Sequence, residues 1–227
     1  MSRLQRDMSH KKRDTPLIST SYESIRVIDD WLNPEGAEAV LQLGLASDYV
    51  DMEWGGHVYP STAMCSDDMA ETMRGPLSAA VGGEVEIVNT FFRLSHEDLH
   101  MGDIYTNAEV EPHEFRVHWD PGMGPFTAIL YLNRPPYDVG GTAYWRHVPS
   151  SRTSVKGLKK GTPTYEQLFR DCTDGMAWEL HSLVGSQWNR LAIYRSDLIH
   201  SQWPLAGWGS TKDTSRLVWV CFFTMPQ

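Results

Sequence analysis

The stretch HWDPGMGPFTAILYLN, residues 118–133, joins two potential metal-binding side chains to a long apolar segment. It begins with the pattern His118-Trp119-Asp120, and a Pro-Gly pair follows. The run FTAILYLN, residues 126–133, has the length and apolar character of a buried strand. Because residues two apart on an extended chain point to the same face, the side chains of His118 and Asp120 are expected on one side. The stretch therefore predicts a strand-rich fold with a candidate metal site at a strand end.

Segments rich in β-branched and aromatic residues predict further strands on both sides of this stretch. The expected strands are residues 85–94, 113–119, 126–133, 140–147, 189–195 and 215–223. A polar, Gly-containing insertion, residues 148–188, separates the fourth strand from the fifth, and Thr162-Pro163 is a candidate start of a short helix inside it.

Two helices are expected before the strands. Asn33 is a capping residue, and the proline and glutamate after it favour the first turn of a helix over residues 34–46. A second helix is expected to begin near Ser66, to kink at Pro76 and to end at the Gly-Gly pair 82–83. The order of elements predicts a mostly β fold, an antiparallel barrel or a double sheet, buttressed by N-terminal helices.

The composition of the 227 residues is that of an ordinary globular chain, with 41% hydrophobic and 22% charged residues. The net charge of −9 does not favour non-specific binding to nucleic acid. No segment approaches the ~20 apolar residues that span a membrane. The three cysteines, odd in number and far apart, fit reduced thiols in a cytoplasmic protein better than a disulfide framework.

The chain is expected to form one domain. Residues 1–20 are locally basic at their start, contain no apolar run and are expected to be a disordered arm, not a signal peptide. Residues 21–227 are expected to form the single domain, with a helical part to about residue 84 and a strand-rich core from about residue 85.

A second metal-binding pattern competes with His118 and Asp120. The segment SHEDLHMG contains His96-Glu97-x-x-His100, which on a helix would bind zinc and mark a peptidase. The same segment also contains His96-x-Asp98, a second H-x-D pattern. The segment directly follows a strand-like run and has no amphipathic helix around it, so a polar loop is the favoured interpretation.

The order of motifs resembles that of the iron(II)/2-oxoglutarate-dependent oxygenases, particularly the prolyl-hydroxylase-like branch. The chain contains HWD, ILYLN, VGGTAYW, SDLIH and SRLVWV in the order of that family, between about residues 115 and 223. Each motif is weak alone, and the five in order are a more specific signal. The resemblance implies a double-stranded β-helix, a jelly-roll or cupin-like fold.

The resemblance also implies a role for each matching residue. His118, Asp120 and His200 would be the catalytic residues that bind Fe(II), since two imidazoles and one carboxylate leave three positions open for cosubstrates. Arg216 on the last strand would bind the distal carboxylate of 2-oxoglutarate, because a guanidinium is a forked and permanently charged donor. The hydroxyl of Tyr131 would donate to the same carboxylate.

The chain departs from the family pattern in three places. Sixteen residues separate His200 from Arg216, a longer gap than the branch suggests. The insertion of residues 148–188 is larger than a hairpin needs, and the first ~110 residues match no named pattern. We expect substrate recognition to lie in these two regions.

The function expected from the resemblance is oxidation of an unactivated C–H bond of a small molecule, with 2-oxoglutarate and O2 as cosubstrates. An amino acid or a natural-product precursor is the expected substrate, and hydroxylation the expected outcome, with desaturation or ring closure left open. The alternatives are prolyl-hydroxylase-like modification of a peptide or protein, and a non-catalytic metal-binding jelly-roll module. Neither a nucleic acid nor a membrane is expected as a partner, and the oligomeric state stays open.

Four arginines lie on expected strands, where alternation sends some side chains inward. They are Arg93, Arg116, Arg146 and Arg195. An inward arginine would require an anion such as a substrate carboxylate, whereas an outward one is simply solvated.

Overall fold

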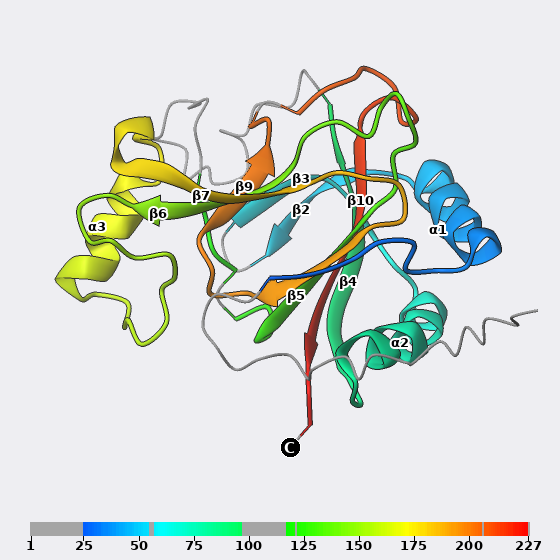
Figure 1. Ribbon diagram of the computed structural model, residues 1–227, viewed down its shortest axis with the longest axis horizontal. Coiled ribbons are helices and arrows are strands. Elements are labelled where there is room, and N and C mark those ends of the chain that lie inside the picture. The colour runs from blue at the N-terminus through cyan, green and yellow to red at the C-terminus, as the bar shows by residue number, and fades with distance from the viewer. Residues whose placement is uncertain (1–24, 55–56, 97–116, 121, 206, 227) are drawn as a thin grey trace, which may run out of the picture.

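Two antiparallel sheets form the centre of the molecule in the computed structural model, which describes residues 25–54, 57–96, 117–120, 122–205 and 207–226 (Figure 1). The larger sheet has the strand order β1-β8-β5-β10-β4-β3-β2, and the smaller sheet has the order β7-β6-β9. The strands of the larger sheet are β1 (Arg26–Ile28), β2 (Val50–Trp54), β3 (His57–Met64), β4 (Glu86–Ser95), β5 (Phe126–Tyr131), β8 (Leu191–Arg195) and β10 (Arg216–Thr224). Those of the smaller sheet are β6 (Gly141–His147), β7 (Trp178–Gly185) and β9 (His200–Trp203).

The helices begin and end where capping residues allow it. In α1 (Pro34–Ala46) the side chain of Asn33 accepts a hydrogen bond from the amide of Gly36 at 2.7 Å. In α2 (Asp67–Val81) the Ser66 hydroxyl accepts from a backbone amide of the first turn, and Gly82 ends the helix in the left-handed conformation. Pro76 lies inside α2 without ending it. Both predicted helices are therefore confirmed.

The alternation of β10 divides the core into two layers. One set of its side chains packs among residues of α1 and α2 on the outer face of the larger sheet: Leu217, Trp219, Cys221 and Phe223. The other set faces the smaller sheet: Arg216, Val218, Val220 and Phe222. Figure 1 shows α1 and α2 on one side of the molecule and α3 (Pro163–Asp171) on the other. The space between the sheets is thus enclosed on both sides.

The predicted mostly β, double-sheet fold with N-terminal helices is confirmed. The part before residue 84, however, also contains β1, β2 and β3, and the expected insertion contributes α3, β7 and the one-turn helix η2 (Gly175–Ala177). The N-terminal strands escaped the pattern because they are irregular: β3 contains a proline and the left-handed Ser61, and the β2–β3 register shifts between Val50 and Met52.

Further expectations concern the cysteines, membrane-spanning helices, the N-terminal arm and the strand before Asp120. The three cysteines form no disulfide. Within the described part of the chain, no helix combines the length and apolar character needed to cross a membrane. The expected N-terminal arm and most of the expected strand of residues 113–119 lie outside the described residues.

Candidate active site

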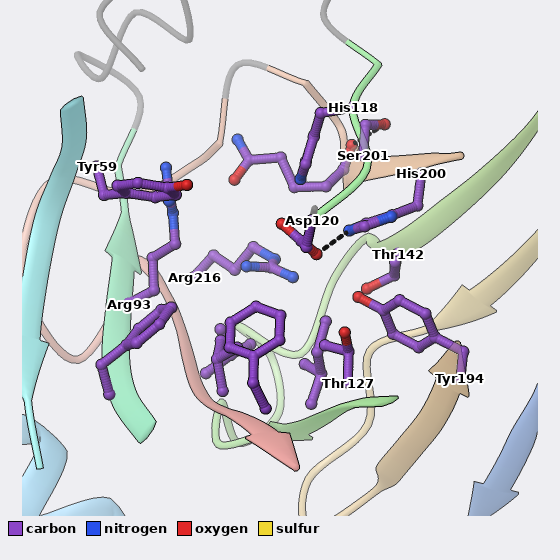
Figure 2. A pocket seen from close by; sticks show the side chains of 16 residues that line it. Tyr59, Arg93, His118, Asp120, Thr127, Thr142, Tyr194, His200, Ser201 and Arg216 are labelled. Carbon is purple, nitrogen blue, oxygen red and sulfur yellow. Dashed lines mark hydrogen bonds and ion pairs between the residues drawn. The ribbon is translucent and has the colours of Figure 1, made fainter. Parts of the chain in front are cut away.

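A cavity of about 80 Å³ lies between the two sheets, and His118, Asp120, His200 and Arg216 line it (Figure 2). Its polar lining residues are Tyr59, Arg93, His118, Asp120, Thr127, Thr142, Tyr194, His200, Ser201, Gln202 and Arg216. Its apolar lining residues are Phe91, Ile129, Val218, Val220 and Phe222. These residues come from both sheets, so the cavity exists only when the two sheets face each other.

Backbone pairing brings His118 and His200 together, although 82 positions separate them. The amide of His118 donates to the carbonyl of His200 at 2.9 Å, and the reverse bond measures 2.8 Å. This reciprocal pair places both side chains on the same face, with ring centroids 4.4 Å apart. Asp120 lies two residues farther along the extended segment and so faces the same side. One potential ligand atom from each of the three side chains lies within 4.8 Å of the others.

Hydrogen bonding sets the orientation of the His200 ring. Its Nδ1 lies 2.8 Å from the carbonyl oxygen of Leu198, which can only accept, so Nδ1 carries the proton in this arrangement. In the neutral ring, Nε2 then presents a lone pair toward the Oδ2 atom of Asp120, 3.3 Å away. Two acceptors face each other at this distance, and a cation or a proton between them resolves the conflict. The arrangement is that of a metal-binding histidine whose second nitrogen is fixed by the backbone.

The environment keeps Asp120 ionised. Burial by itself raises the pKa of the carboxyl group. A hydrogen bond from His200, which requires a proton on Nε2, and the positive charges of His200, His118 and Arg93 outweigh burial and lower the pKa below its ordinary value. A deprotonated carboxylate is the form that binds a metal ion. The three residues therefore present two imidazoles and one carboxylate on one side of the cavity.

Arg216 provides a buried positive charge at the start of β10. Its side chain belongs to the inner face of the larger sheet and the residue is only 3% exposed. Its Nε has no hydrogen-bond partner, and no ion pair of Arg216 exists among the described residues. Burial lowers the pKa of the guanidinium, yet an arginine stays protonated in proteins. A buried cation without a carboxylate partner indicates a binding site for an anion.

Tyr131 lies one layer behind the cavity. Its hydroxyl donates to the Oγ1 atom of Thr142 at 2.7 Å, and the residue is fully buried. Thr142 lines the cavity, as does Tyr194 from β8. The structure thus places Tyr131 in contact with a lining residue, and its expected contact with the cosubstrate stays a prediction.

The four candidate arginines differ in where the structure places them. Arg93 lines the cavity. Arg146 pairs with Glu179 at 3.2 Å on the surface, and Arg195 pairs with Asp197 at 2.9 Å. Arg116 lies outside the described residues.

The competing zinc pattern cannot be placed in full. His96 follows the last residue of β4, and Glu97, Asp98 and His100 lie outside the described residues. Within the described part of the chain, the group of three residues that can hold a metal is His118, Asp120 and His200.

Several polar lining residues escaped the sequence interpretation, among them Tyr194, Gln202 and Tyr59. Tyr194 could have been found from the alternation of the strand NRLAIYR, because Ala192 and Tyr194 both belong to the inner layer of the core and Tyr194 lines the cavity. Gln202 lies on β9, which reads as a loop because only four residues are extended. Tyr59 lies on β3, and the proline that follows it hides the strand pattern.

The fold is shared with solved enzymes of low sequence similarity. No protein-family model matches the chain, and no curated protein matches it. The crystal structure of the non-heme alpha ketoglutarate dependent epimerase SnoN from nogalamycin biosynthesis aligns with a TM-score of 0.51 and 13% identity, covering 88% of this chain and 78% of SnoN. That of AviO1 from Streptomyces viridochromogenes Tue57 aligns with a TM-score of 0.50 and 16% identity, covering 90% of this chain and 91% of AviO1. The chain therefore has the double-stranded β-helix fold that the sequence predicted.

Proposed function

We propose that this chain is an Fe(II)- and 2-oxoglutarate-dependent oxygenase that oxidises an unactivated C–H bond of a small molecule. One observation carries the proposal: a single cavity contains both the His118, Asp120 and His200 cluster and the buried cation of Arg216, which has no carboxylate partner among the described residues. A metal site and an anion site in one enclosed space are what a metal-dependent enzyme with an acidic cosubstrate requires.

The donor set fits Fe(II). Two neutral imidazoles and one carboxylate form the facial set of ligands that non-heme iron oxygenases use, with positions left open for other ligands. The facing lone pairs of His200 and Asp120 support an ion at this position, because a cation removes their mutual repulsion. When bound, the iron supplies the oxidising power that amino-acid side chains lack.

The anion site fits 2-oxoglutarate. The guanidinium of Arg216 offers a planar fork of donors that matches a carboxylate, and its burial makes the pairing strong. In the proposal Thr142 is held toward the cavity by its hydrogen bond with Tyr131, so Tyr131 acts through Thr142. Replacing Tyr131 by phenylalanine is then expected to weaken 2-oxoglutarate binding by about 1 kcal/mol.

The apolar wall has a separate task in the proposed reaction. Phe91, Ile129, Val218, Val220 and Phe222 surround the polar cluster and limit the access of water to it. Exclusion of water strengthens the ionic contacts inside and protects a reactive state from side reactions. A cavity that lies between two sheets suits a small molecule, or the tip of one, better than a folded protein surface.

Hydroxylation is the proposed outcome, and the substrate is proposed to be an amino acid or a natural-product precursor. The fold partner SnoN is described as an epimerase of nogalamycin biosynthesis, so this fold also supports return of hydrogen to the substrate carbon. Mass spectrometry separates the two outcomes. A hydroxylated product gains one oxygen, whereas an epimerised product keeps its mass and gains deuterium in heavy water.

The decisive experiment measures cosubstrate turnover. Purified protein with Fe(II), ascorbate and 2-oxoglutarate in air should form succinate slowly by itself and faster with pools of small acids. Asp120→Ala and His200→Ala should abolish this reaction, and the surface variant Arg146→Gln should leave it unchanged. Failure of the Mn(II)-loaded wild-type protein to bind 2-oxoglutarate would exclude the proposed function and favour a non-catalytic metal-binding module.

A further inference from the structure

The insertion of residues 148–188 lies outside the cavity. The structure describes every residue of this insertion, and none of them is among the residues that line the cavity. Its helix α3 lies on the side of the molecule opposite α1 and α2 (Figure 1). The cavity lining thus gives no support to the expected part of the insertion in substrate recognition.

The insertion instead holds both segments that carry the candidate ligands. The amide of Val117 donates to the carbonyl of Cys172, directly after α3, at 3.0 Å. The amide of Ile199 donates to the carbonyl of Thr153, near the start of the insertion, at 2.9 Å. Each of these two amides belongs to the residue directly before a candidate histidine ligand. The insertion therefore contacts the metal site from its outer side.

Trp119 lies between the candidate ligands His118 and Asp120 in the chain and points the opposite way. Because successive side chains of an extended segment alternate, the two ligands line the cavity and Trp119 faces the insertion. Trp119 is 7% exposed and belongs to the same apolar cluster as Leu168 of α3. Its ring meets that of Tyr165, also on α3, edge to face, with ring centroids 5.5 Å apart. A shift of the Trp119 ring would therefore shift the backbone that carries both ligands.

Backbone hydrogen bonds alone do not fix the direction of the two ligands. The amide of His118 bonds to His200, and the amide of Asp120 bonds to the carbonyl of Ser196 at 3.0 Å. These bonds set the distance between the segments, whereas rotation of the ligand segment about its own axis is the softer motion. A large side chain packed on the opposite face resists this rotation, which would move both ligands together. Metal ligands must be held within about 0.5 Å of their working positions.

From these contacts we infer that Trp119 and Tyr165 are positioning residues of the metal site, and that the insertion holds the metal ligands instead of selecting the substrate. The inference rests on the metal site of the proposed function. Neither aromatic ring lines the cavity, so both act only through the segment that carries His118 and Asp120. The affinity for a metal ion should therefore depend on how this segment packs against α3.

The test measures Mn(II) affinity by electron paramagnetic resonance of free Mn(II). Trp119→Leu stays apolar but loses the aromatic contact. It should bind Mn(II) about tenfold more weakly than wild type, as is usual when a residue that orients a ligand is lost. Trp119→Phe keeps a ring toward Tyr165 and should recover most of the affinity. Tyr165→Leu should weaken binding about 2- to 10-fold, which corresponds to the loss of one aromatic pair.

Two further measurements separate positioning from a general loss of stability. Trp119→Leu and Tyr165→Leu remove the same contact, so the double variant should bind Mn(II) no more weakly than Trp119→Leu alone. Two independent losses would multiply instead. In addition, Co(II) bound to Trp119→Leu should have a visible absorption spectrum different from that of the wild-type complex, because this spectrum depends on the coordination geometry.

Trp219 provides the matched control. It is buried on β10 between the lining residues Val218 and Val220, and it faces away from the cavity, but neither neighbour is a candidate ligand. Trp219→Leu should lower the stability in urea unfolding and leave the Mn(II) affinity and the Co(II) spectrum unchanged. Equal Mn(II) affinities of Trp119→Leu and Trp219→Leu would overturn the inference. If circular dichroism shows that Trp119→Leu is unfolded, the comparison of Tyr165→Leu with Trp219→Leu decides in the same way.

Failure of the proposed function gives a different pattern. A wild-type protein that binds Mn(II) but not 2-oxoglutarate would exclude the oxygenase, and weaker Mn(II) binding by Trp119→Leu would still support the positioning role. A wild-type protein that binds no Mn(II) would overturn both proposals. Binding of Mn(II) and 2-oxoglutarate by wild type, with an unchanged Mn(II) affinity in Trp119→Leu and Tyr165→Leu, would overturn the inference alone.

Discussion

Among the described residues, two histidine–aspartate pairs differ in where the ring proton lies. In the first pair, at the outer side of the smaller sheet, Nε2 of His147 lies 2.8 Å from Oδ2 of Asp171, and Nδ1 lies 2.7 Å from the hydroxyl of Ser150. The carboxylate can only accept, so the proton lies on Nε2, and the serine hydroxyl donates to Nδ1. Both ring nitrogens of His147 therefore have a hydrogen-bond partner within the protein.

The second pair is arranged in the opposite way. His200 directs its Nδ1 proton to the carbonyl of Leu198 and turns Nε2 toward Asp120, where His118 also points. The two pairs consist of the same residue types, yet only in the second do two acceptors face each other, and a cation or a proton between them resolves this conflict. A histidine–aspartate contact thus indicates a metal site when the backbone holds the ring proton away from the carboxylate.

The largest effect should follow from breaking the second pair. His200→Ala or Asp120→Ala should weaken Mn(II) binding by at least about 100-fold, because each removes one of the three proposed ligands. Loss of a residue that only hydrogen-bonds to a ligand already costs about 10–100-fold in metal affinity. His118→Ala should behave in the same way. Titration of the metal, followed by electron paramagnetic resonance of free Mn(II), measures the loss.

The first pair provides the matched control for this experiment. His147→Ala removes a buried histidine that also contacts an aspartate, but it should leave Mn(II) affinity unchanged. If His147→Ala lowered the affinity for Mn(II) as strongly as His200→Ala, the distinction between the two pairs would be wrong. If His96→Ala abolished Mn(II) binding and His118→Ala did not, the metal site would lie at the competing pattern His96-Glu97-x-x-His100.

A second effect, on the affinity for 2-oxoglutarate, is expected from the anion site. Arg216→Met should weaken 2-oxoglutarate binding by about 2–5 kcal/mol, because the distal carboxylate loses its charged partner. The same variant without ligand should be at least as stable as wild type, since a buried cation without a carboxylate partner is replaced by an apolar side chain of similar length. Calorimetric titration and urea unfolding measure the two quantities. A variant that lost stability and kept 2-oxoglutarate binding would show a structural arginine instead.

Loss of the first pair should lower the stability of the protein and leave its Mn(II) affinity unchanged. His147→Ala leaves Asp171 and Ser150 without their partner beneath the turn after β6, so the free energy of unfolding should fall by about 1–3 kcal/mol. Urea unfolding of the metal-free protein measures it. His200→Ala should cost less under the same conditions, because its ring borders an existing cavity.

The sequence predicted the second pair and not the first, for a physical reason. The ligand set could be read from the H-x-D spacing and from the order of motifs along regular strands. The run of β-branched and aromatic residues after Ser215 likewise placed Arg216 at the start of the last strand, where the structure has it. His147, in contrast, meets Asp171 through α3 and the turns around it, which lie in the region read as an insertion. Contacts made by irregular segments leave no periodic signal, and Tyr59 on β3 was missed for the same reason.

The smallest effect concerns the stability of the protein at acidic pH, and it follows from the lowered pKa of Asp120. A carboxyl group with a pKa lowered by folding stabilises the folded state above its unfolded pKa of about 3.9, and this contribution is lost as the pH falls through the folded pKa. Asp120→Asn keeps the shape and removes the charge, so it never has this contribution. The stability advantage of metal-free wild type over Asp120→Asn should therefore decline as the pH falls below about 4. Urea unfolding with a chelator over this range measures the difference. An advantage that stayed constant down to about pH 2 would contradict the assignment, because Asp120 would then titrate alike in the folded and unfolded chains.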